Sequence, residues 1–320
     1  MAMAFIFPGQ GSQAVGMGKA LADAFPQARN VFAELDEVLS QKLSTLIFEG
    51  PESELTLTVN AQPALMAVSM AVLRVLEAEA GLDLAREAKF VAGHSLGEYS
   101  ALAAAGSFSF ADAARLLRLR GRAMQEAVPV GIGAMAAILG LDFSETSAVA
   151  AMAAQDLRAA GAVCQAANDN GGGQVVISGT KEAVERAMNI ARTKGARRAM
   201  LLPVSAPFHC ALMQPAADAM AAALADVVIR PPSVPLVANV LAAAISDPSE
   251  IRRRLVEQVT GTVRWQESIV YMADRGVDMF YELGAGKVLS SLVKRITEKA
   301  GGAAIGAPAE VAAFKSQVRG

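Results

Sequence analysis

Cysteine and histidine are scarce in this sequence, with two of each among 320 residues. Cys164 and Cys210 lie far apart and form no CxxC or Cys/His spacing, so the sequence predicts neither a disulfide framework nor a zinc site. Because disulfides are rare where thiols are kept reduced, this cysteine use is typical of a cytoplasmic protein. We therefore expect a cytoplasmic location and no bound metal.

No charge of one sign dominates the chain either. The 29 Lys and Arg residues nearly balance the 31 Asp and Glu residues, which leaves a net charge of −2. Binding to nucleic acid requires an excess of positive charge on one face, so we expect no nucleic-acid partner. The hydrophobic fraction of 53% is large enough to bury a core and excludes a disordered chain. At roughly 150 residues per domain, the length predicts two domains or one large α/β domain with an insertion.

We expect neither a secretory signal nor a membrane-spanning segment in this sequence. The first seven residues carry no positive charge and run into Pro8, so we expect no secretory signal. Residues 55–73 and 199–217 are uncharged, but both contain prolines and polar side chains. We interpret both stretches as buried core and expect no membrane span.

Hydrophobic patterning predicts an α/β protein. An apolar run at 4–7 ends in the glycine loop 8–13, and a second run at 89–92 leads through a tight turn into a helix at 98–105. Further helices are predicted at 26–39, 63–80, 110–127, 213–224 and 250–259, with apolar strands at 234–240 and 278–282.

Between residues 129 and 203 the pattern changes to a shorter alternation. Apolar segments at 133–141, 175–177 and 197–204 alternate with helices near 146–159 and 181–193. This β-α-β-α-β order predicts a small α+β domain of residues 129–203, inserted into a catalytic domain built from residues 1–128 and 204–320.

Gly93-His94-Ser95-Leu96-Gly97 matches the G-x-S-x-G pattern of a nucleophile elbow. Glycines on both sides of the serine allow a sharp turn from strand to helix, which exposes the Ser95 hydroxyl. The free N–H groups at the helix start then lie beside it, so the Leu96 N–H is a natural oxyanion donor. Five-residue matches also arise by chance, but the predicted strand before the turn and helix after it favour the elbow.

A nucleophilic serine needs a base, and the sequence offers two histidines. His94 adjoins Ser95, and neighbouring side chains on an elbow point apart, so we interpret His94 as a structural hydrogen-bonding residue or a secondary residue of the pocket. His209, 114 residues beyond Ser95, is the candidate base, and the alternative is a histidine that only stabilises the core. No carboxylate is assigned as the partner of this histidine. A backbone carbonyl can fix its tautomer instead.

Arg120 lies on the apolar side of the predicted helix 110–127, whereas Arg115, Arg118 and Arg122 share another face. A buried guanidinium needs an anion and is suited to grip a carboxylate through two parallel hydrogen bonds. The pattern leaves two possibilities, an internal salt bridge or the carboxylate of a substrate.

Two glycine segments suggest nucleotide binding only loosely. Residues 9–14 fit a G-x-G-x-x-A fingerprint, but Pro8 precedes them and no helix is predicted to open at once, so a second oxyanion loop explains the backbone equally well. Residues 284–288 lack the first glycine and the final Ser or Thr of a phosphate loop.

Taken together, these residues resemble the malonyl-CoA:acyl carrier protein transacylases of fatty-acid synthesis and the related acyltransferase domains of polyketide synthases. The resemblance runs nearly end to end, and the order and spacing of its blocks make it specific. The matching blocks are Phe7-Pro8-Gly9-Gln10-Gly11-Ser12-Gln13, Gly93-His94-Ser95-Leu96-Gly97-Glu98-Tyr99-Ser100-Ala101-Leu102, Arg120-Gly121, Ala167-Asn168, Ser205-Ala206-Pro207-Phe208-His209 and Glu282-Leu283-Gly284-Ala285-Gly286-Lys287-Val288-Leu289.

The resemblance implies an α/β-hydrolase-like core interrupted by a ferredoxin-like small domain, with the active site in the cleft between them. Ser95 would be the nucleophile and His209 the base. The backbone of Gln10 and Leu96 would supply the oxyanion donors, and the main-chain carbonyl of Gln258 would orient the histidine in place of an aspartate.

The resemblance also implies the substrate contacts. Arg120 would bind the malonyl carboxylate, and Asn168 would lie near the cleft. In the related acyltransferases, a branched apolar residue after the serine and a phenylalanine before the histidine accompany malonyl rather than methylmalonyl units. Leu96 and Phe208 occupy those positions here, although some bacterial relatives have serine at the second.

The implied reaction is malonyl transfer from malonyl-CoA to the phosphopantetheine thiol of an acyl carrier protein, through a malonyl-serine intermediate and with no cofactor. We expect a monomer. An acidic carrier protein would need a basic patch, for which the candidates are Arg192, Lys194, Arg197 and Arg198, or Lys287, Lys294 and Arg295. A malonate-decarboxylase subunit, a polyketide loading enzyme, a thioesterase or esterase, and a nucleotide-binding module are the alternatives.

Overall fold

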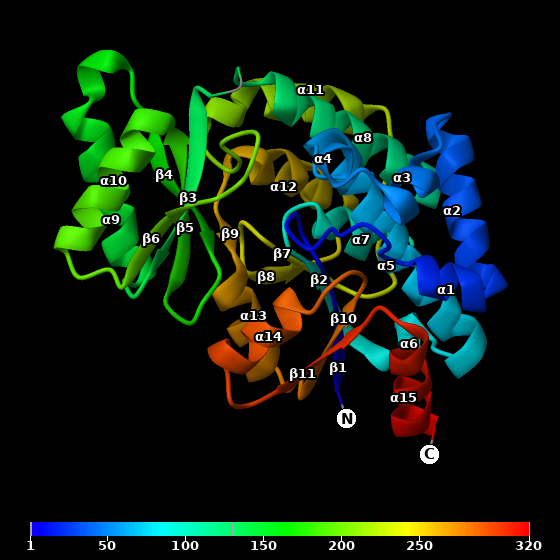
Figure 1. The fold of residues 1–320 in the computed structure, drawn as a ribbon. Helices are drawn as coiled ribbons and strands as arrows, with labels where there is room; N and C mark the ends of the chain where they lie inside the picture. Colours follow the sequence, from blue (N-terminus) through cyan, green and yellow to red (C-terminus); the bar gives the residue numbers. More distant parts are fainter. Residues whose placement is uncertain (1, 130, 320) are drawn as a thin grey trace.

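The computed structural model describes residues 2–129 and 131–319, and their strands form two sheets (Figure 1). The six-stranded sheet has the order β11-β10-β1-β2-β7-β8 and is parallel except for the β7–β8 pair. Its strands are β1 (Met3–Phe7), β2 (Ala88–Gly93), β7 (Leu236–Ala238), β8 (Ala243–Ile245), β10 (Met279–Leu283) and β11 (Gly301–Ile305).

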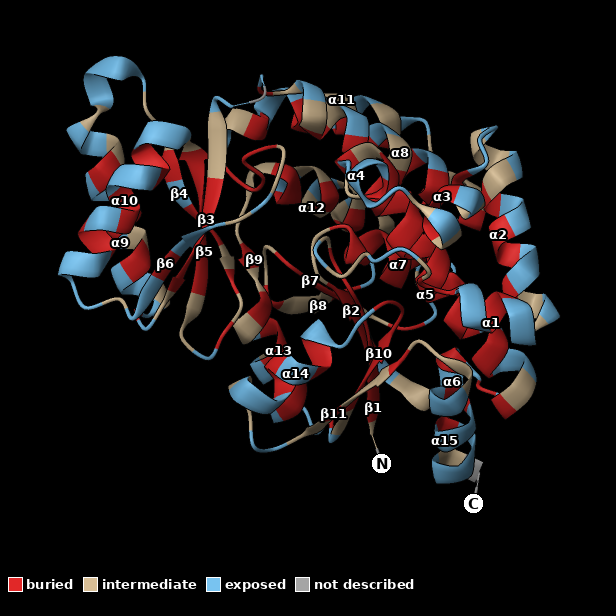
Figure 2. Cartoon of the chain, viewed as in Figure 1, coloured by how far each residue is buried: buried red, intermediate tan, exposed pale blue. Residues whose placement is uncertain are grey.

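Helices cover both faces of this sheet, because alternate residues of its strands enter two different cores. Phe5 and Phe7 of β1 belong to the larger core, whereas Ala4 and Ile6 belong to the opposite one. The burial of both faces explains the continuous apolar run at the start of the chain (Figure 2).

The helices before the second sheet are α1 (Lys19–Ala24), α2 (Pro26–Leu39), α3 (Leu43–Glu49), α4 (Glu52–Leu55), α5 (Thr58–Ala80), α6 (Leu84–Glu87), α7 (Gly97–Ala104) and α8 (Phe110–Glu126). Those after it are α11 (Gln214–Ala225), α12 (Pro248–Thr260), α13 (Trp265–Asp274), α14 (Val288–Ile296) and α15 (Pro308–Arg319), with a 3-10 turn at Ala211–Met213.

The five-stranded sheet has the order β6-β3-β5-β4-β9 and carries α9 (Phe143–Asp156) and α10 (Lys181–Thr193) around a separate core. Its strands are β3 (Gly133–Leu139), β4 (Cys164–Asp169), β5 (Gln174–Thr180), β6 (Arg198–Leu201) and β9 (Val263–Arg264), and a 3-10 turn spans Arg158–Ala160. Residues 133–201 thus form a β-α-β-β-α-β unit, which is the ferredoxin-like order. The predicted α/β-hydrolase-like core with a ferredoxin-like small domain is confirmed.

The sequence-based order β-α-β-α-β for this unit was wrong by one strand, β4. Its sequence, Cys164-Gln165-Ala166-Ala167-Asn168-Asp169, contains no β-branched or aromatic residue and gives no apolar signal. It becomes a strand because β5 pairs with it on one side and β9 pairs with it on the other.

Helix α5 is the one helix of the described chain that is long and apolar enough to cross a membrane, and 89% of its apolar window is buried inside the protein. The prediction of buried core is therefore confirmed for the part of residues 55–73 that lies in α5, which starts at Thr58 and holds Pro63 within its second turn. Leu57, just before the helix, is 43% exposed, so the prediction was wrong there. Residues 199–217 instead divide among β6, a loop and the start of α11. Met200 and Leu201 are exposed, so the prediction of buried core was wrong there.

Candidate active site

Three neighbouring parallel strands, β1, β2 and β7, end at the same edge of the large sheet. Because ligands of open α/β sheets bind beyond the carboxyl ends of the strands, this edge is the expected place for a site. The loops that leave these strands carry Gln10, Ser95 and Asn239, so residues far apart in the sequence meet there.

Ser95 occupies the turn between β2 and α7 with a positive φ of 53°, an unusual conformation for a residue with a side chain. The turn closes tightly around two glycines. A Cβ on Gly93 would lie 1.9 Å from the Gly97 backbone, and a Cβ on Gly97 would lie 2.3 Å from the Phe7 carbonyl oxygen. The local geometry is that of the nucleophile elbow predicted from the G-x-S-x-G pattern.

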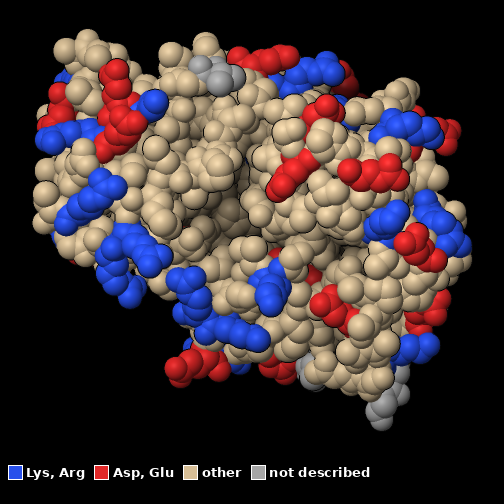
Figure 3. Space-filling model, in the orientation of Figure 1, with Lys and Arg blue, Asp and Glu red and all other residues tan. Residues whose placement is uncertain are grey.

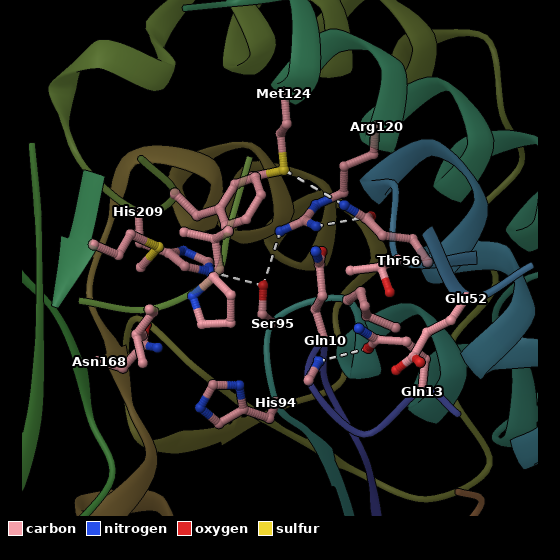
Figure 4. A pocket seen from close by; sticks show the side chains of 18 of the residues that line it. Gln10, Gln13, Glu52, Thr56, His94, Ser95, Arg120, Met124, Asn168 and His209 are labelled. Carbon is pink, nitrogen blue, oxygen red and sulfur yellow. Dashed lines mark hydrogen bonds between the residues drawn. The ribbon is translucent and has the colours of Figure 1, made fainter. Parts of the chain in front are cut away.

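His209 faces the elbow serine. Its Nε2 lies 2.7 Å from Ser95 Oγ (Figure 4). Its Nδ1 lies 2.9 Å from the carbonyl oxygen of Gln258 on α12. Since a carbonyl can only accept, Nδ1 carries the hydrogen and Nε2 is free to accept from the serine hydroxyl. Burial and the nearby charge of Arg120 lower the pKa of His209 to about 3, against the opposing hydrogen bond to Gln258. The imidazole is therefore a neutral acceptor at neutral pH.

Arg120, on α8, reaches the same hydroxyl from the other side. Its side chain is 1% exposed, and Nη2 donates to Ser95 Oγ at 3.1 Å and to Gln258 Oε1 at 2.8 Å, while Nη1 donates to Gln62 Oε1 at 2.9 Å. Ser95 Oγ thus accepts from a guanidinium and donates to an imidazole. Burial lowers the pKa of Arg120 from its usual high value, and the neighbouring Tyr99 and Glu98 oppose this shift.

The internal salt bridge considered for Arg120 is absent from the described part of the chain, in which no carboxylate lies within 4.0 Å of the guanidinium. The Nε of Arg120 is buried and has no hydrogen-bond partner among the described residues. A buried cation with an unused donor can bind an anion that enters the site.

The backbone N–H groups of Gln10 and Leu96 donate to no partner within residues 2–129 and 131–319. Gln10 lies in the loop after β1, and its side chain donates to Thr58 Oγ1 at 3.1 Å. Leu96 immediately precedes α7. Free N–H groups from two adjacent strand ends form the arrangement expected of an oxyanion hole. The first helix after the Gln10 loop begins only at Lys19, so the loop lacks the helix that a dinucleotide fingerprint requires.

These groups face a cavity of about 770 Å³ in the hollow between the two sheets (Figure 3), a volume typical of ligand sites. Phe208 and Leu96 line the cavity from the large core, and Asn168 lines it from β4. The Oδ1 atom of Asn168 is buried without a partner among the described residues. Seven of the predicted site residues therefore line this cavity, namely Gln10, Ser95, Leu96, Arg120, Asn168, Phe208 and His209. Gln258 does not line it and reaches the site through its carbonyl bond to His209.

His94 also borders the cavity but does not bond Ser95. Its Nε2 lies 2.9 Å from Asn170 Oδ1, and its ring packs against Trp265 with centroids 5.6 Å apart. Burial lowers the pKa of His94. These contacts agree with the structural interpretation of this histidine.

Three residues of the site were not singled out in the sequence. Gln62 holds Arg120, and Asn239 accepts the Ser95 N–H at 2.8 Å. Glu98 is 1% exposed and accepts from Asn239 N–H and from Gln258 Nε2. Burial raises the pKa of Glu98 to about 8, while its hydrogen bonds and Arg120 act in the opposite direction. A signal existed for two of them, since Asn239 follows an apolar strand and Glu98 is a charge within the apolar helix after the elbow.

The described chain contains no group of three His, Cys, Asp or Glu side chains that could hold a metal ion.

Comparison with known proteins agrees with the geometry of this site. Residues 4–313 match a family model described as the acyl transferase domain. The chain is 48% identical over 297 residues to the malonyl CoA-acyl carrier protein transacylase of Bacillus subtilis strain 168, covering 93% of this chain and 91% of that protein. The crystal structure of the acyl-carrier-protein-S-malonyltransferase from Bartonella henselae superimposes with a TM-score of 0.96 at 55% identity, covering 100% of both chains. A malonyl-transacylase solved in complex with a type II polyketide synthase acyl-carrier protein gives a TM-score of 0.94 at 43% identity, covering 99% of this chain and 100% of that chain.

The fold and the elbow geometry define an α/β enzyme of the acyltransferase class. Within that class, the identity extends over almost the whole length of the relatives. The chain belongs to the family of malonyl CoA-acyl carrier protein transacylases.

Proposed function

We propose that this enzyme transfers the malonyl group of malonyl-CoA to the phosphopantetheine thiol of an acyl carrier protein, and so supplies malonyl-carrier for fatty-acid synthesis. The observation that carries the proposal is the Arg120 guanidinium, which is buried in the cavity wall with Nη2 3.1 Å from Ser95 Oγ. An acyl group with a carboxylate is the substrate that such a neighbour of the nucleophile would select. The names of the relatives agree.

In the first half-reaction, Ser95 Oγ attacks the thioester carbonyl while its proton passes to His209 Nε2. The Oγ–Nε2 distance of 2.7 Å supports direct transfer. The developing oxyanion is stabilised by the N–H groups of Gln10 and Leu96. When the tetrahedral intermediate collapses, the C–S bond breaks, the CoA thiolate takes the proton from His209, and a malonyl ester remains on Ser95.

In the second half-reaction, the carrier thiol enters the cavity and gives its proton to His209, and its sulfur attacks the ester. Collapse then breaks the C–O bond and returns the proton to Ser95. The Gln258 carbonyl keeps the same imidazole nitrogen protonated in both halves. The scheme predicts ping-pong kinetics and needs no cofactor, since malonyl-CoA and the carrier are both substrates.

The substrate contacts follow from the cavity wall. Arg120 binds the malonyl carboxylate through its unused donors, and Leu96 and Phe208 limit the space beside the acyl chain, which favours malonyl over methylmalonyl. Asn168 lines the same cavity and is the further substrate contact of the proposal.

The carrier is the proposed protein partner, and one relative was solved with such a protein. Lys287, Lys294 and Arg295 are exposed and form the proposed docking patch. Figure 3 shows Lys and Arg side chains gathered along the rim below the hollow. The proposal includes a cytoplasmic monomer that binds neither nucleic acid nor membrane, and the two free cysteines support a reducing compartment.

The proposed domain boundaries are those expected from the sequence, with a catalytic domain of residues 1–128 and 204–320 and a small domain of residues 129–203. Their support is the separate core of the small domain. One strand crosses the division, since β9 belongs to the C-terminal part of the chain and pairs with β4.

Release of CoA from malonyl-CoA, measured with a carrier that bears phosphopantetheine and with the same carrier without it, tests the proposal. We expect one rapid turnover without the thiol and continuous turnover with it. Continuous release in the absence of the thiol would mean that water is the acceptor, and the enzyme would then be a thioesterase.

A further inference from the structure

Glu98 is a buried carboxylate to which the proposed reaction assigns no step. It lies in the first turn of α7, three residues after Ser95, and is 1% exposed. Its Oε1 accepts from the Asn239 backbone N–H at 2.6 Å, and its Oε2 accepts from Gln258 Nε2. A buried charge is costly unless its hydrogen bonds are satisfied, so its two partners explain why it is tolerated there.

The first partner, Asn239, holds both sides of the elbow. Its Oδ1 accepts the Ser95 N–H at 2.8 Å, and its Nδ2 donates to the Gly93 carbonyl at 2.8 Å. Glu98 fixes the backbone of this residue and so supports the strained φ of Ser95.

The second partner, Gln258, contacts the other groups of the site. Its carbonyl accepts from His209 Nδ1, and its side-chain Oε1 accepts from Arg120 Nη2 at 2.8 Å. Its Nε2 donates to Glu98 and, at 2.9 Å, to the Ser95 carbonyl. The carboxamide therefore has one productive orientation, because a rotation by 180° would turn its NH₂ group toward the guanidinium.

Both partners of Glu98 are N–H donors, so these contacts belong to its ionised form, although burial raises the pKa of Glu98 to about 8. The ionised group accepts at both oxygens and so imposes that orientation. An amide at position 98 would have to present its own NH₂ group either to the Asn239 N–H or to the Gln258 NH₂, which places a donor against a donor. The carboxamide of Gln258 would then rotate, and Arg120 would lose its acceptor.

We propose that Glu98 is a positioning residue for malonyl transfer, which orients the Gln258 carboxamide and thereby fixes Arg120 relative to Ser95. The inference rests on the proposed function, because it concerns the arginine that binds the malonyl carboxylate. Glu98 contacts neither His209 nor the cavity, and it acts through Gln258 and Asn239.

The matched control is Glu282, a second carboxylate with 0% exposure. It lies on β10 and accepts the backbone N–H groups of Leu289 at 3.1 Å and Ser290 at 2.7 Å, outside the cavity. If buried carboxylates matter here only for stability, Glu98→Gln and Glu282→Gln should behave alike.

The test compares the wild type, Glu98→Gln and Glu282→Gln by the single-turnover rate of Ser95 acylation from malonyl-CoA and from acetyl-CoA, with thermal unfolding in parallel. We expect both variants to unfold at lower temperature. We expect only Glu98→Gln to lose malonyl loading by roughly 10- to 100-fold, the range of one hydrogen bond to a charged group, and to lose acetyl loading by less. Equal losses for both acyl groups, or a malonyl loss no larger than that of Glu282→Gln, would overturn the inference.

A second variant keeps the test decisive if Glu98→Gln folds poorly. Gln258→Met removes the carboxamide but keeps the backbone carbonyl that bonds His209, so it should reproduce the selective malonyl loss. The double variant should lose little more malonyl loading than either single variant, because both changes remove the same interaction between Glu98 and the Gln258 side chain. Additive losses would contradict this shared interaction.

A wild type that takes up no malonyl would overturn the proposed function together with the inference. A wild type that loads normally beside an unaffected Glu98→Gln would overturn the inference alone.

Discussion

Replacing Arg120 with alanine separates the two acyl groups that the cavity could accept. Arg120 is 1% exposed and makes three hydrogen bonds, to Gln62, Ser95 and Gln258. In the proposed complex, its unused donors bind the malonyl carboxylate. Removing one partner from a buried, hydrogen-bonded charge pair costs about 2–5 kcal/mol, which is a loss of roughly 30- to 5000-fold in kcat/KM for malonyl-CoA.

Acetyl-CoA has no carboxylate, so it loses much less. The variant removes the hydrogen bond from Arg120 to Ser95, worth about 1–3 kcal/mol. It also removes a positive charge that lowers the pKa of His209, which makes the base stronger and offsets part of that loss. We therefore expect the malonyl-to-acetyl preference to fall by roughly tenfold, which corresponds to the difference of about 1.5 kcal/mol between the midpoints of these two costs.

The assay is CoA release in the presence of the phosphopantetheine carrier, measured with each thioester. Arg118→Ala is the matched control, because Arg118 lies on the same helix and donates to Asn60 Oδ1 at 2.9 Å, outside the cavity. It should leave the preference unchanged. Equal fold-losses for malonyl-CoA and acetyl-CoA in Arg120→Ala would refute the role of Arg120 as carboxylate ligand.

Three further predictions concern stability, backbone geometry and the carrier. Because the pKa of His209 falls to about 3 on folding, the folded state binds fewer protons than the unfolded state, and the free energy of unfolding decreases as pH falls below 6.5, by up to about 1.4 kcal/mol per pH unit. In urea unfolding, His209→Gln should show a shallower dependence of this free energy on pH between 6.5 and 5 than the wild type, and an equal dependence would contradict a neutral buried imidazole. Gly97→Ala places a Cβ 2.3 Å from the Phe7 carbonyl oxygen, so the elbow must move. We expect a lower melting temperature and at least a tenfold slower acylation of Ser95, whereas unchanged acylation kinetics would show that the close contact is not needed. Turnover with the carrier should fall steeply as the salt concentration rises. The double variant Lys287→Glu, Lys294→Glu should lower turnover with the carrier without changing the acylation of Ser95 by malonyl-CoA alone. Turnover that does not respond to salt would argue against the proposed docking patch.

Much of the site could be predicted from local sequence patterns. The G-x-S-x-G spacing predicts the elbow, because only glycine fits at the positions two residues before and two residues after Ser95, which are Gly93 and Gly97. Helical periodicity places Arg120 on the buried face of α8, and the structure confirms that burial. The scarcity of histidine limits the choice of base to His209, which the structure places beside the serine.

The remaining parts depend on contacts between distant segments. Strand β4 forms because its neighbours pair with it, and its own residues give no strand signal. Gln62 lies 58 residues from Arg120 in sequence, and Asn239 lies 144 residues from Ser95. No local pattern encodes such contacts, and polar residues in apolar elements indicate only that a partner exists.

The most direct test of the central claim is intact-protein mass spectrometry after mixing with malonyl-CoA, acetyl-CoA or methylmalonyl-CoA. The account predicts one malonyl adduct on the wild type, much less adduct from the other two thioesters, and none on Ser95→Ala. An adduct that persists in Ser95→Ala, or steady release of free CoA with no adduct on the wild type, would contradict a malonyl-serine intermediate.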